Sequence, residues 1–492
     1  MLLKDILANQ KHNEKIAIKY GSESISYKDL FHASDKLARD LGQIQSHSVK
    51  IGLLLPNSIS YAVAYFAIAN LNRIIVPISP QSKFEEIRRT IEHCDLDILV
   101  TNREFQSLLL RHESNMIYKL NIYNIEDGTT VSIGLHHVDE LIRIDAEPNE
   151  DDVAIMLPTS GSTNFPKRVM LSHKNLISNV KSNIASLQLT EDDVGLISLP
   201  MNFGYCNTAQ FLTHMYLGAT IVIMKHAFIP QMFWKLVEKE KVTNFTGVPT
   251  MLLMLLKYPA PADLDVSSLR YVCFGGGVMP TDKLKALMDK YPGTGFVHTY
   301  GQTEASPRLT ALLPEHSRSK IGSVGLPIPD VKLRIVDESG TDVSGDQFGE
   351  IIVSGANVMK GYYKDENETE KVLRNGWLYT GDIGYRDADG FLYLAGRKRN
   401  IIISGGVNIY PEEIESTLVS HPEVENAIVT GEDHELLGEV PVAKVVLIPG
   451  STLSESELAD YCLGKLPISK VPRKFVFVSE LKKTITGKIK RE

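Results

Sequence analysis

The chain has 492 residues, of which 43% are hydrophobic and 23% are charged, a composition typical of soluble globular proteins. Its length predicts about three domains, and its 35 glycines and 23 prolines exclude collagen-like and low-complexity chains. The 60 acidic and 52 basic residues give a net charge of −8. Because nucleic acids and anionic membranes select a basic face, neither is expected as the main partner.

The cysteines and the apolar segments indicate a cytoplasmic protein. The four cysteines lie far apart and show neither Cys-x-x-Cys nor zinc-ligand spacing, so we expect free, buried thiols in a reducing compartment. Residues 1–15 lack the long apolar region of a secretory signal. The longest apolar stretch, residues 51–78, is interrupted by Pro56 and Arg73 and does not predict a transmembrane segment.

Alternating strand and helix patterns fill the chain up to about residue 395. The first clear group is a βαβ unit with a strand over 49–55, a helix over 58–71 and a strand over 74–78. Further strands are predicted over 153–157, 194–199, 219–224, 242–245 and 271–274, and further helices over 173–187, 230–241 and 281–291. Strands that alternate with helices favour parallel sheets, in which ligands bind in the loops after the strands.

The pattern changes near residue 320. Short strands separated by turn signals predict a β-rich subdomain at about 320–395; they lie over 331–336, 350–353 and 391–395. An α+β pattern follows Gly396, with strands over 401–404 and around Ala427 and Val446, and helices over 412–419 and from Glu455. We therefore predict an α/β fold: a large N-terminal domain of α/β sheets plus the β-rich subdomain over 1–395, and a small α+β C-terminal domain over 396–492.

The strongest local signal is the segment 159–168, TSGSTNFPKR, which follows a predicted strand and precedes a predicted helix. Its backbone N–H groups, hydroxyls and lysine can surround a polyphosphate, although its spacing is not that of a Walker A loop. The candidate phosphate ligands are Thr159, Ser160, Gly161, Ser162, Thr163 and Lys167. Taken alone, the segment is better explained as a plain surface loop.

Further segments carry groups that suit a nucleotide. Residues 274–280, FGGGVMP, let a flat purine approach the glycine backbone, and residues 300–304, YGQTE, offer an aromatic face and a carboxylate suited to Mg²⁺. Asp382 and Arg397 can bind ribose hydroxyls or phosphate, and residues 486–490, TGKIK, form a basic tail. Each segment alone has a simpler explanation as a turn or a solvated charge, but chance explains the ordered set poorly.

This ordered set resembles the adenylate-forming superfamily, which contains acyl- and aryl-CoA synthetases, peptide-synthetase adenylation domains and firefly luciferase. The resemblance extends from Ser26 to Lys488 and includes GGVNIYPEEIE at 405–415, whose form is closer to that of CoA synthetases. It implies a two-step ligase that uses ATP and Mg²⁺. A carboxylate attacks the α-phosphate to give acyl-AMP and pyrophosphate, and the acyl group then passes to a thiol, either CoA or the phosphopantetheine of a separate carrier protein.

The resemblance also implies a role for each matching residue. The implied catalytic residues are Lys488, the adenylation lysine, with Glu304 and Thr303, and the implied metal ligands are Glu304 and Thr163. The implied nucleotide contacts are Thr159, Ser160, Gly161, Ser162, Thr163, Lys167, Gly275, Gly276, Gly277, Tyr300, Gly301, Asp382 and Arg397. In the C-terminal domain, which is mobile in the family, Arg399 matches the hinge, and Gly405 and Gly406 match the loop that enters the site for thioester formation.

Two residues depart from the family pattern, since Asn164 and Arg168 stand where glycine is usual. Asparagine tolerates a left-handed backbone and can keep the turn. Arg168 either adds a cation near the phosphates or points to solvent, and we expect solvent. Two alternatives to a ligase follow. An Arg168 that blocks the loop would leave a protein that binds nucleotide without catalysis, and a luciferase-like protein would oxidise the adenylate.

The acid substrate is less clearly indicated. Phe203 resembles the aromatic gate beside the acyl pocket, and it is followed by Gly204 instead of the aspartate typical of domains that take α-amino acids. The predicted pocket residues are Asn202, Phe203, Phe245 and Gly247. They indicate a mixed, moderately apolar pocket, and core packing is the alternative for each of them.

We expect Lys488→Ala to slow adenylation by about 10²–10³-fold, because an ammonium at ~4 Å contributes about 4 kcal/mol against one charge at an effective dielectric constant of ~20. Thioester formation from supplied acyl-AMP should survive better. Single-turnover pyrophosphate release measures the first step, and acyl-CoA formation from acyl-AMP measures the second. Equal loss of both steps would contradict this role for Lys488.

Overall fold

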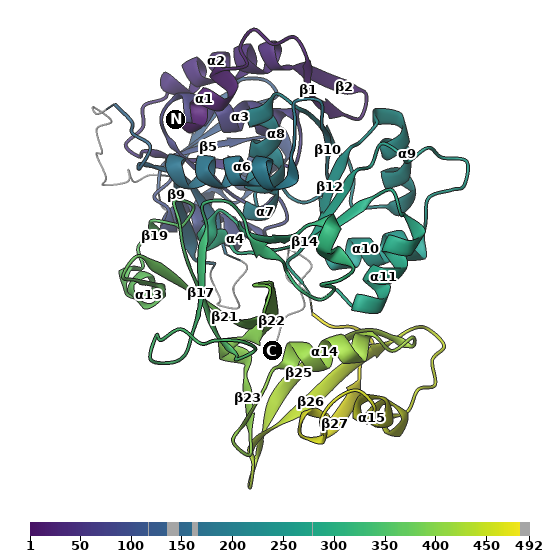
Figure 1. Cartoon of the computed structure of the whole chain (residues 1–492). Coiled ribbons are helices and arrows are strands. Elements are labelled where there is room, and N and C mark those ends of the chain that lie inside the picture. The colour runs from purple at the N-terminus through teal and green to yellow at the C-terminus, as the bar shows by residue number, and fades with distance from the viewer. Residues whose placement is uncertain (117, 135–146, 160–165, 278, 483–492) are drawn as a thin grey trace.

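The computed structural model describes residues 1–116, 118–134, 147–159, 166–277 and 279–482. Its N-terminal part contains two large sheets with helices between and around them (Figure 1). Within the described residues, the first sheet has nine strands in the order β16-β15-β14-β13-β12-β10-β11-β1-β2. They are β1 (Ile16–Tyr20), β2 (Glu23–Ser26), β10 (Val194–Ile197), β11 (Thr220–Ile223), β12 (Asn244–Gly247), β13 (Tyr271–Phe274), β14 (Gly295–Gly301), β15 (Arg308–Leu312) and β16 (Leu326–Pro327).

The second sheet has the strand order β19-β9-β8-β4-β3-β5-β6-β7. Its strands are β3 (Lys50–Leu54), β4 (Ile74–Pro77), β5 (Ile98–Thr101), β6 (Leu120–Asn124), β7 (Thr130–Ile133), β8 (Val153–Pro158), β9 (Arg168–Ser172) and β19 (Gly361–Tyr362). The interior of each sheet is parallel, and antiparallel strands close the edges. Strands β3 and β4 pair in parallel, which confirms the predicted βαβ unit.

Helix α3 (Ile59–Asn70) joins the two sheets into one core. It contacts β3 and β4 of the second sheet and β1 of the first, and all of residues 61–69 are buried. A helix that packs on every side needs no polar face, which accounts for the sequence AVAYFAIA. The other longer helices of this part are α2 (Tyr27–Gly42), α4 (Phe84–His93), α5 (Arg103–Arg111), α6 (His173–Leu187), α9 (Pro230–Glu240), α10 (Pro249–Lys257) and α11 (Thr281–Lys290).

The candidate phosphate segment connects two antiparallel strands, which the sequence analysis did not predict. Strand β8 pairs with β9, with Pro158 opposite Arg168, so a strand separates the segment from the following helix. Helix α6 begins only at His173, where the Ser172 side chain caps it by accepting from the Asn175 N–H. The predicted helix over 173–187 is confirmed, but the five-residue strand before it was too short to give a pattern.

Arg168 does not point to solvent, which corrects the expectation from the sequence. The residue is only 4% exposed. Its guanidinium donates to the Pro77 carbonyl at 2.8 Å and to the Thr90 hydroxyl at 3.1 Å. Arg168 therefore ties β9 to β4 and to helix α4, where a glycine would leave the carbonyl without this donor.

A β-rich subdomain follows the two sheets, as predicted. Its sheet has the order β17-β18-β21-β20, with β22 paired to β21. The strands are β17 (Lys332–Val336), β18 (Gly349–Ser354), β20 (Leu373–Arg374), β21 (Trp377–Arg386) and β22 (Leu392–Arg397), and helix α13 (Glu366–Val372) lies between β19 and β20 in the chain. The predicted domain boundary at Gly396 falls one residue before the end of β22.

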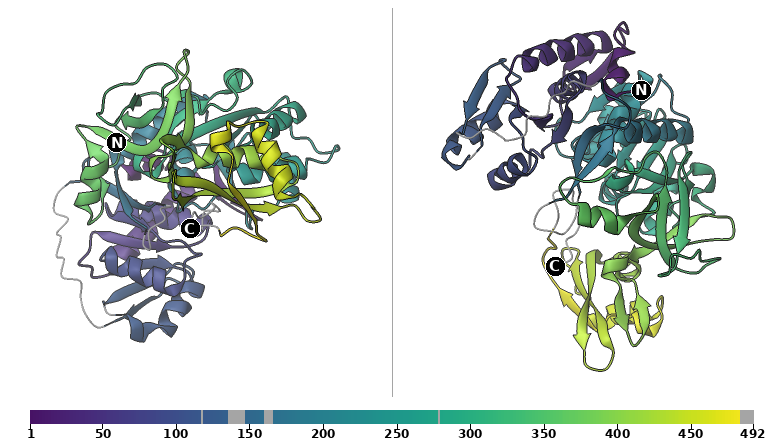
Figure 2. Two further views of the ribbon diagram at one scale, coloured as in Figure 1. Left: turned by 90° about the horizontal axis from the view of Figure 1, so that it is seen from below. Right: turned by 90° about the vertical axis from the view of Figure 1, so that its left-hand side faces the viewer.

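The C-terminal part forms a small body at one end of the molecule (Figure 1; Figure 2, right). Its sheet has the order β24-β23-β26-β25, with β27 added parallel to β26. The elements are β23 (Ile402–Ser404), β24 (Val407–Ile409), α14 (Pro411–Val419), β25 (Val424–His434), β26 (Gly438–Leu447), α15 (Glu455–Leu463) and β27 (Lys474–Phe477). Together these parts confirm the predicted α/β fold with a large N-terminal and a small α+β C-terminal part.

The cysteines agree with the expectation of free thiols. Cys94, Cys206, Cys273 and Cys462 are all described, buried and unpaired. In the described part of the chain, no helix combines the length and the apolar character that a bilayer span requires.

We expect Arg168→Met to lower the first thermal unfolding transition by on the order of 5 °C, because the buried Pro77 carbonyl loses its charged donor, a loss of about 2 kcal/mol. The KM for ATP should stay near the wild-type value, since the guanidinium faces β4 and α4. Differential scanning calorimetry and initial rates measure the two effects. A large rise in the KM for ATP without a change in stability would place Arg168 at the phosphates instead.

Candidate active site

Three of the predicted nucleotide contacts meet around one carboxylate. The Tyr300 hydroxyl of β14 donates to Asp382 Oδ2 at 2.7 Å, and Arg397 Nε lies 2.7 Å from Asp382 Oδ1. Asp382 on β21 stands directly opposite Arg397 on β22 in the antiparallel ladder. The carboxylate thus joins the last parallel strand of the first sheet to two strands of the β-rich subdomain, where the sequence predicted a ribose contact.

Burial and neighbouring charge together set the protonation states of the groups around this carboxylate. Burial raises the pKa of Tyr300, and the negative charge of Asp382 raises it further, so the phenol remains a hydrogen-bond donor at neutral pH. Burial works against the charge of Arg397, but the carboxylate of Asp382 holds the pKa of this guanidinium above its usual value. A carboxylate can accept more than one hydrogen bond on each oxygen, which suits a contact with ribose hydroxyls.

The end of β13 lies very close to β14, and only glycine permits this approach. A Cβ on Gly275 would lie 2.4 Å from the Thr299 carbonyl oxygen, well inside van der Waals contact. Gly276 follows with a φ of +79°, a conformation that other residues rarely adopt. The backbone of the predicted adenine segment is therefore bare beside Tyr300, as a flat ligand would require.

Glu304 lies in the short helix η3 (Thr303–Ala305) directly after β14. Its Oε1 accepts a hydrogen bond from the Tyr362 hydroxyl of β19 at 2.9 Å. A Cβ on Gly301 would lie 1.8 Å from the Pro307 carbonyl oxygen, so the chain can turn back closely enough to place Glu304 here only with glycine. Magnesium is usually held by one or two carboxylates together with substrate phosphates, and Glu304 fits such a site.

Lys167 lies beside the same tyrosine. Its Nζ is 4.8 Å from the centre of the Tyr362 ring and 2.5 Å from Glu368 Oε2 of α13. The charges of Lys167 and Lys371 lower the pKa of Glu368 to about 2, so this ion pair persists at neutral pH. Tyr362 thus holds Glu304 with its hydroxyl and Lys167 with its ring, and brings two predicted site residues together.

Neither Tyr362 nor Glu368 was predicted from the sequence. Tyr362 is 58 residues from Glu304 and carries no motif of its own. The next residue, Tyr363, anchors this edge strand from its other face, because its hydroxyl lies 2.6 Å from both Lys50 Nζ and Asp95 Oδ2. The alternation of Tyr362 with the half-buried Tyr363 just after β19 was the only signal, and a two-residue strand is too short to reveal it.

The predicted acid pocket is brought together only in part. Asn202 is buried, and Phe203 is half-buried at the start of helix α7 (Gly204–Cys206). A Cβ on Gly204 would lie 3.4–3.5 Å from Leu157 and Thr303, so this segment contacts strand β8 and the Glu304 segment.

Phe245 and Gly247 lie deeper in the first sheet. Phe245 is fully buried, and its ring packs against Phe228 and Phe233 in the aromatic core. A Cβ on Gly247 would lie 2.9 Å from this ring. Core packing, the alternative named for each pocket residue, accounts for Phe245 in the structure.

The remaining predicted residues lie in the C-terminal part or outside the described residues. Arg399 is exposed in the short helix η4 (Lys398–Asn400). Gly405 and Gly406 form the exposed turn between β23 and β24, with φ values of +57° and +81°, and the Gly405 N–H donates to the Leu437 carbonyl at 2.8 Å. Lys488 and the segment 160–164, with Ser160, Gly161, Ser162, Thr163 and Asn164, lie outside the described residues.

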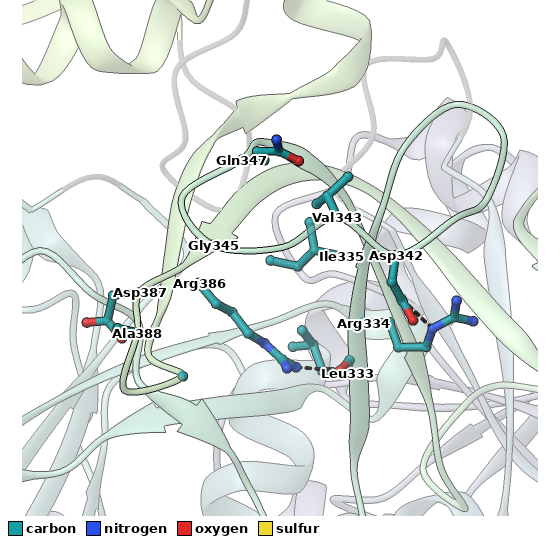
Figure 3. Close-up of a pocket in the computed structure, with 11 residues that line it drawn as sticks. Leu333, Arg334, Ile335, Asp342, Val343, Gly345, Gln347, Arg386, Asp387 and Ala388 are labelled. Carbon is teal, nitrogen blue, oxygen red and sulfur yellow. Dashed lines mark hydrogen bonds and ion pairs between the residues drawn. The ribbon is translucent and has the colours of Figure 1, made fainter.

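A cavity of about 280 Å³ lies apart from these residues, in the β-rich subdomain (Figure 3). Arg334 Nε pairs with Asp342 at 2.7 Å on one side of it, and Arg386 donates to the Leu333 carbonyl on another. No predicted site residue lines this cavity. Each of its charged residues already has a partner in the protein, and we assign no function to it.

The chain matches known proteins over nearly its whole length. The sequence profile described as AMP-binding enzyme covers residues 7–363, and the profile described as AMP-binding enzyme C-terminal domain covers residues 413–488. A feruloyl-CoA synthase from an Amycolatopsis species is 33% identical, with 96% of this chain and 94% of the relative covered. A 2-succinylbenzoate–CoA ligase from Bacillus licheniformis is 34% identical, with 97% and 96% covered.

Solved structures of CoA synthetases also match the fold of this chain. The o-succinylbenzoate CoA synthetase (MenE) from Bacillus subtilis, in complex with the acyl-adenylate intermediate OSB-AMP, has a TM-score of 0.87 and 30% identity over 99% of this chain and 97% of that chain. The same enzyme with ATP and a magnesium ion gives a TM-score of 0.86 and 31% identity over 98% and 97%. The fold and site therefore define an adenylate-forming enzyme. The chain belongs to the AMP-binding enzyme family, and the prediction of an AMP-forming acid–thiol ligase is confirmed.

We expect Glu368→Gln to lower the KM for ATP by about 2- to 5-fold, because Lys167 no longer has to leave a carboxylate before it can bind phosphate, and exposed ion pairs contribute about 0.2–1 kcal/mol. Glu370→Gln is the matched control. It makes the same charge change on the same helix, at an exposed residue. Initial rates at varied ATP measure the effect, and an equal KM in both variants would exclude this competition.

Proposed function

We propose that the chain activates a carboxylic acid with ATP and transfers the acyl group to CoA, through the residues described above. The observation that carries this proposal is the Asp382 carboxylate held between Tyr300 and Arg397, next to the Glu304–Tyr362–Lys167 group. The first cluster suits a ribose and the second suits a metal-bound polyphosphate.

The first step joins two anions, and the site supplies the opposite charge. A carboxylate that attacks a polyphosphate meets strong repulsion, so catalysis depends on cations and oriented N–H donors. We assign these roles to Lys167, Arg397 and Lys488, while Asp382 orients the ribose and the backbone of Gly275–Gly277 receives the adenine. Mg²⁺ held by Glu304 would neutralise phosphate charge when bound. Pyrophosphate then leaves, and the acyl-AMP remains.

The second step requires a different surface, because a thiol must reach the carbonyl carbon from which AMP leaves. We assign this step to the Gly405–Gly406 turn and the hinge to Arg399, both in the C-terminal part. The exposed turn and the short linker between β22 and β23 support a rotation of this part as a unit. Domain alternation about Arg399 would let Lys488 and the glycine turn act in sequence.

CoA is the proposed acceptor, since the named relatives are CoA ligases. A separate carrier protein remains the alternative, and no observation on the described residues favours it. We also propose a cytoplasmic location, which the four unpaired, buried thiols support.

The first measurement is acid-dependent pyrophosphate release with ATP and Mg²⁺ across aryl, short-chain, medium-chain and β-amino acids, each with and without CoA. We expect multiple turnovers only with CoA, together with acyl-CoA detected by mass. A single-turnover burst that CoA does not change would point to a carrier protein. Oxygen consumption would point to an oxygenase, and ATP binding without pyrophosphate release from any acid would contradict a ligase.

A further inference from the structure

Arg308 is a buried charged residue that pairs with no carboxylate among the described residues. It begins β15 and is only 1% exposed. Asn179 holds its backbone by donating to the Arg308 carbonyl at 2.8 Å and accepting from its N–H at 3.4 Å. In the described part of the chain, the guanidinium makes no well-formed hydrogen bond through Nε, Nη1 or Nη2. Its near neighbours are two neutral groups, the Tyr205 hydroxyl and the Cys273 thiol, and no carboxylate among the described residues pairs with it.

The surroundings of this guanidinium are polar but neutral. Strand register places Thr246 beside Cys273 and Cys273 beside Val297, and Thr299 follows on the same face as Val297. Arg308 stands opposite Gly301, one step further along this face. This row of neutral side chains on one face of the sheet thus ends at the guanidinium of Arg308.

Tyr205 lies next to this row. Its hydroxyl is 2.8 Å from Thr299 Oγ1. Because the Thr299 hydroxyl donates to the Phe274 carbonyl, Tyr205 is the donor in this contact. Burial raises the pKa of Tyr205 to about 12, and the charge of Arg308 opposes this shift. Burial likewise raises the pKa of Cys273 against the same charge, so the guanidinium faces both groups.

This place adjoins the proposed acid pocket. Gly301 opposite Arg308 belongs to the YGQTE motif, and Tyr205 directly follows Gly204, which packs beside Thr303. Tyr205 keeps partial exposure while Arg308 has almost none, so the cation lies deeper in the protein than the tyrosine. The same segment contains three other buried polar atoms without a hydrogen-bond partner among the described residues: Asn202 Nδ2, Thr208 Oγ1 and Gln210 Oε1.

We propose that the acid substrate carries a second carboxylate, at the end opposite the one that is activated, and that the Arg308 guanidinium binds it. The inference rests on the proposed ligase function and specifies its substrate class as dicarboxylic acids. An isolated buried charge is strongly unfavourable, and a carboxylate matches the two-pronged geometry of a guanidinium. A monocarboxylic acid of equal length would place an apolar end against an uncompensated cation.

The test compares matched acids on the wild-type protein. Hexanoate and hexanedioate form one pair, and 3-phenylpropanoate and 3-(4-carboxyphenyl)propanoate form another. With ATP, Mg²⁺ and CoA, we expect kcat/KM to be about 100-fold higher for the diacid in at least one pair. A monoacid used as well as or better than its diacid in both pairs would overturn the inference while leaving the ligase function intact.

Variants test the residue itself. In Arg308→Leu we expect the diacid-to-monoacid ratio of kcat/KM to fall by about 100-fold. In Arg308→Lys, which keeps the charge, this ratio should fall less. Arg318→Leu is the control for loss of an arginine, because Arg318 pairs with Asp289 at the surface, and it should keep the wild-type ratio. An unchanged ratio in Arg308→Leu would overturn the proposed contact, and an unchanged KM for ATP excludes general damage.

A binding readout separates failure of the inference from failure of the proposed function. A diacid at millimolar concentration should raise the melting temperature of the wild-type protein but not of Arg308→Leu, because only the folded site binds it. This shift needs no turnover. A rise in melting temperature without pyrophosphate release would support the Arg308 contact and contradict the ligase function. Pyrophosphate release without an Arg308-dependent rise in melting temperature would support the ligase function and contradict the Arg308 contact.

Discussion

The carboxylate of Asp382 connects the separate parts of the N-terminal domain at one point. Tyr300 comes from the large first sheet, and Asp382 and Arg397 come from neighbouring strands of the β-rich subdomain. Asp382 is buried and Tyr300 is 7% exposed, whereas 41% of the Arg397 side chain is exposed. Solvent therefore screens the tyrosine contact less than the arginine contact. Because Arg397 is also the last residue before the linker to the C-terminal sheet, the same carboxylate fixes the point from which that part extends.

A second group completes the charge arrangement around this point. Tyr362 holds Glu304 through its hydroxyl and Lys167 through its ring, while Tyr363 anchors the same strand to the second sheet. Each charged member has an opposite or polar partner in the absence of substrate. A site built in this way avoids uncompensated charge before a nucleotide binds. In the proposed function, Lys167 would exchange Glu368 for phosphate oxygens.

The sequence predicted the fold well where periodicity was long and less well where elements were short. The helix over 173–187 and the strand over 271–274 match the structure residue for residue. The strand β9 was missed because five residues between a glycine-rich segment and a helix give no distinct period. The interiors of both sheets are parallel, as the alternating pattern indicates, but their antiparallel edge strands depend on tertiary pairing that local sequence does not encode.

The site was predicted through motifs, and the residues between motifs were missed. Tyr300, Asp382 and Arg397 meet as the resemblance implies, whereas Tyr362 and Glu368 are contributed by a short strand and a helix without a motif. Phe245 shows the limit for pocket residues, because an aromatic residue in a buried strand can face either the pocket or the core, and one residue of register decides which.

The two buried arginines show why only one of them points to a missing ligand. Arg168 and Arg308 each begin a strand and are 4% and 1% exposed. The Arg168 guanidinium has two acceptors from β4 and α4, and its place in the fold is accounted for by the contacts it makes. The guanidinium of Arg308 makes no well-formed hydrogen bond and pairs with no carboxylate among the described residues, although the fold holds its backbone through Asn179. Its near neighbours, Tyr205 and Cys273, are neutral groups. Because this charge lies beside the proposed acid pocket, the proposed second carboxylate of the substrate would supply the opposite charge.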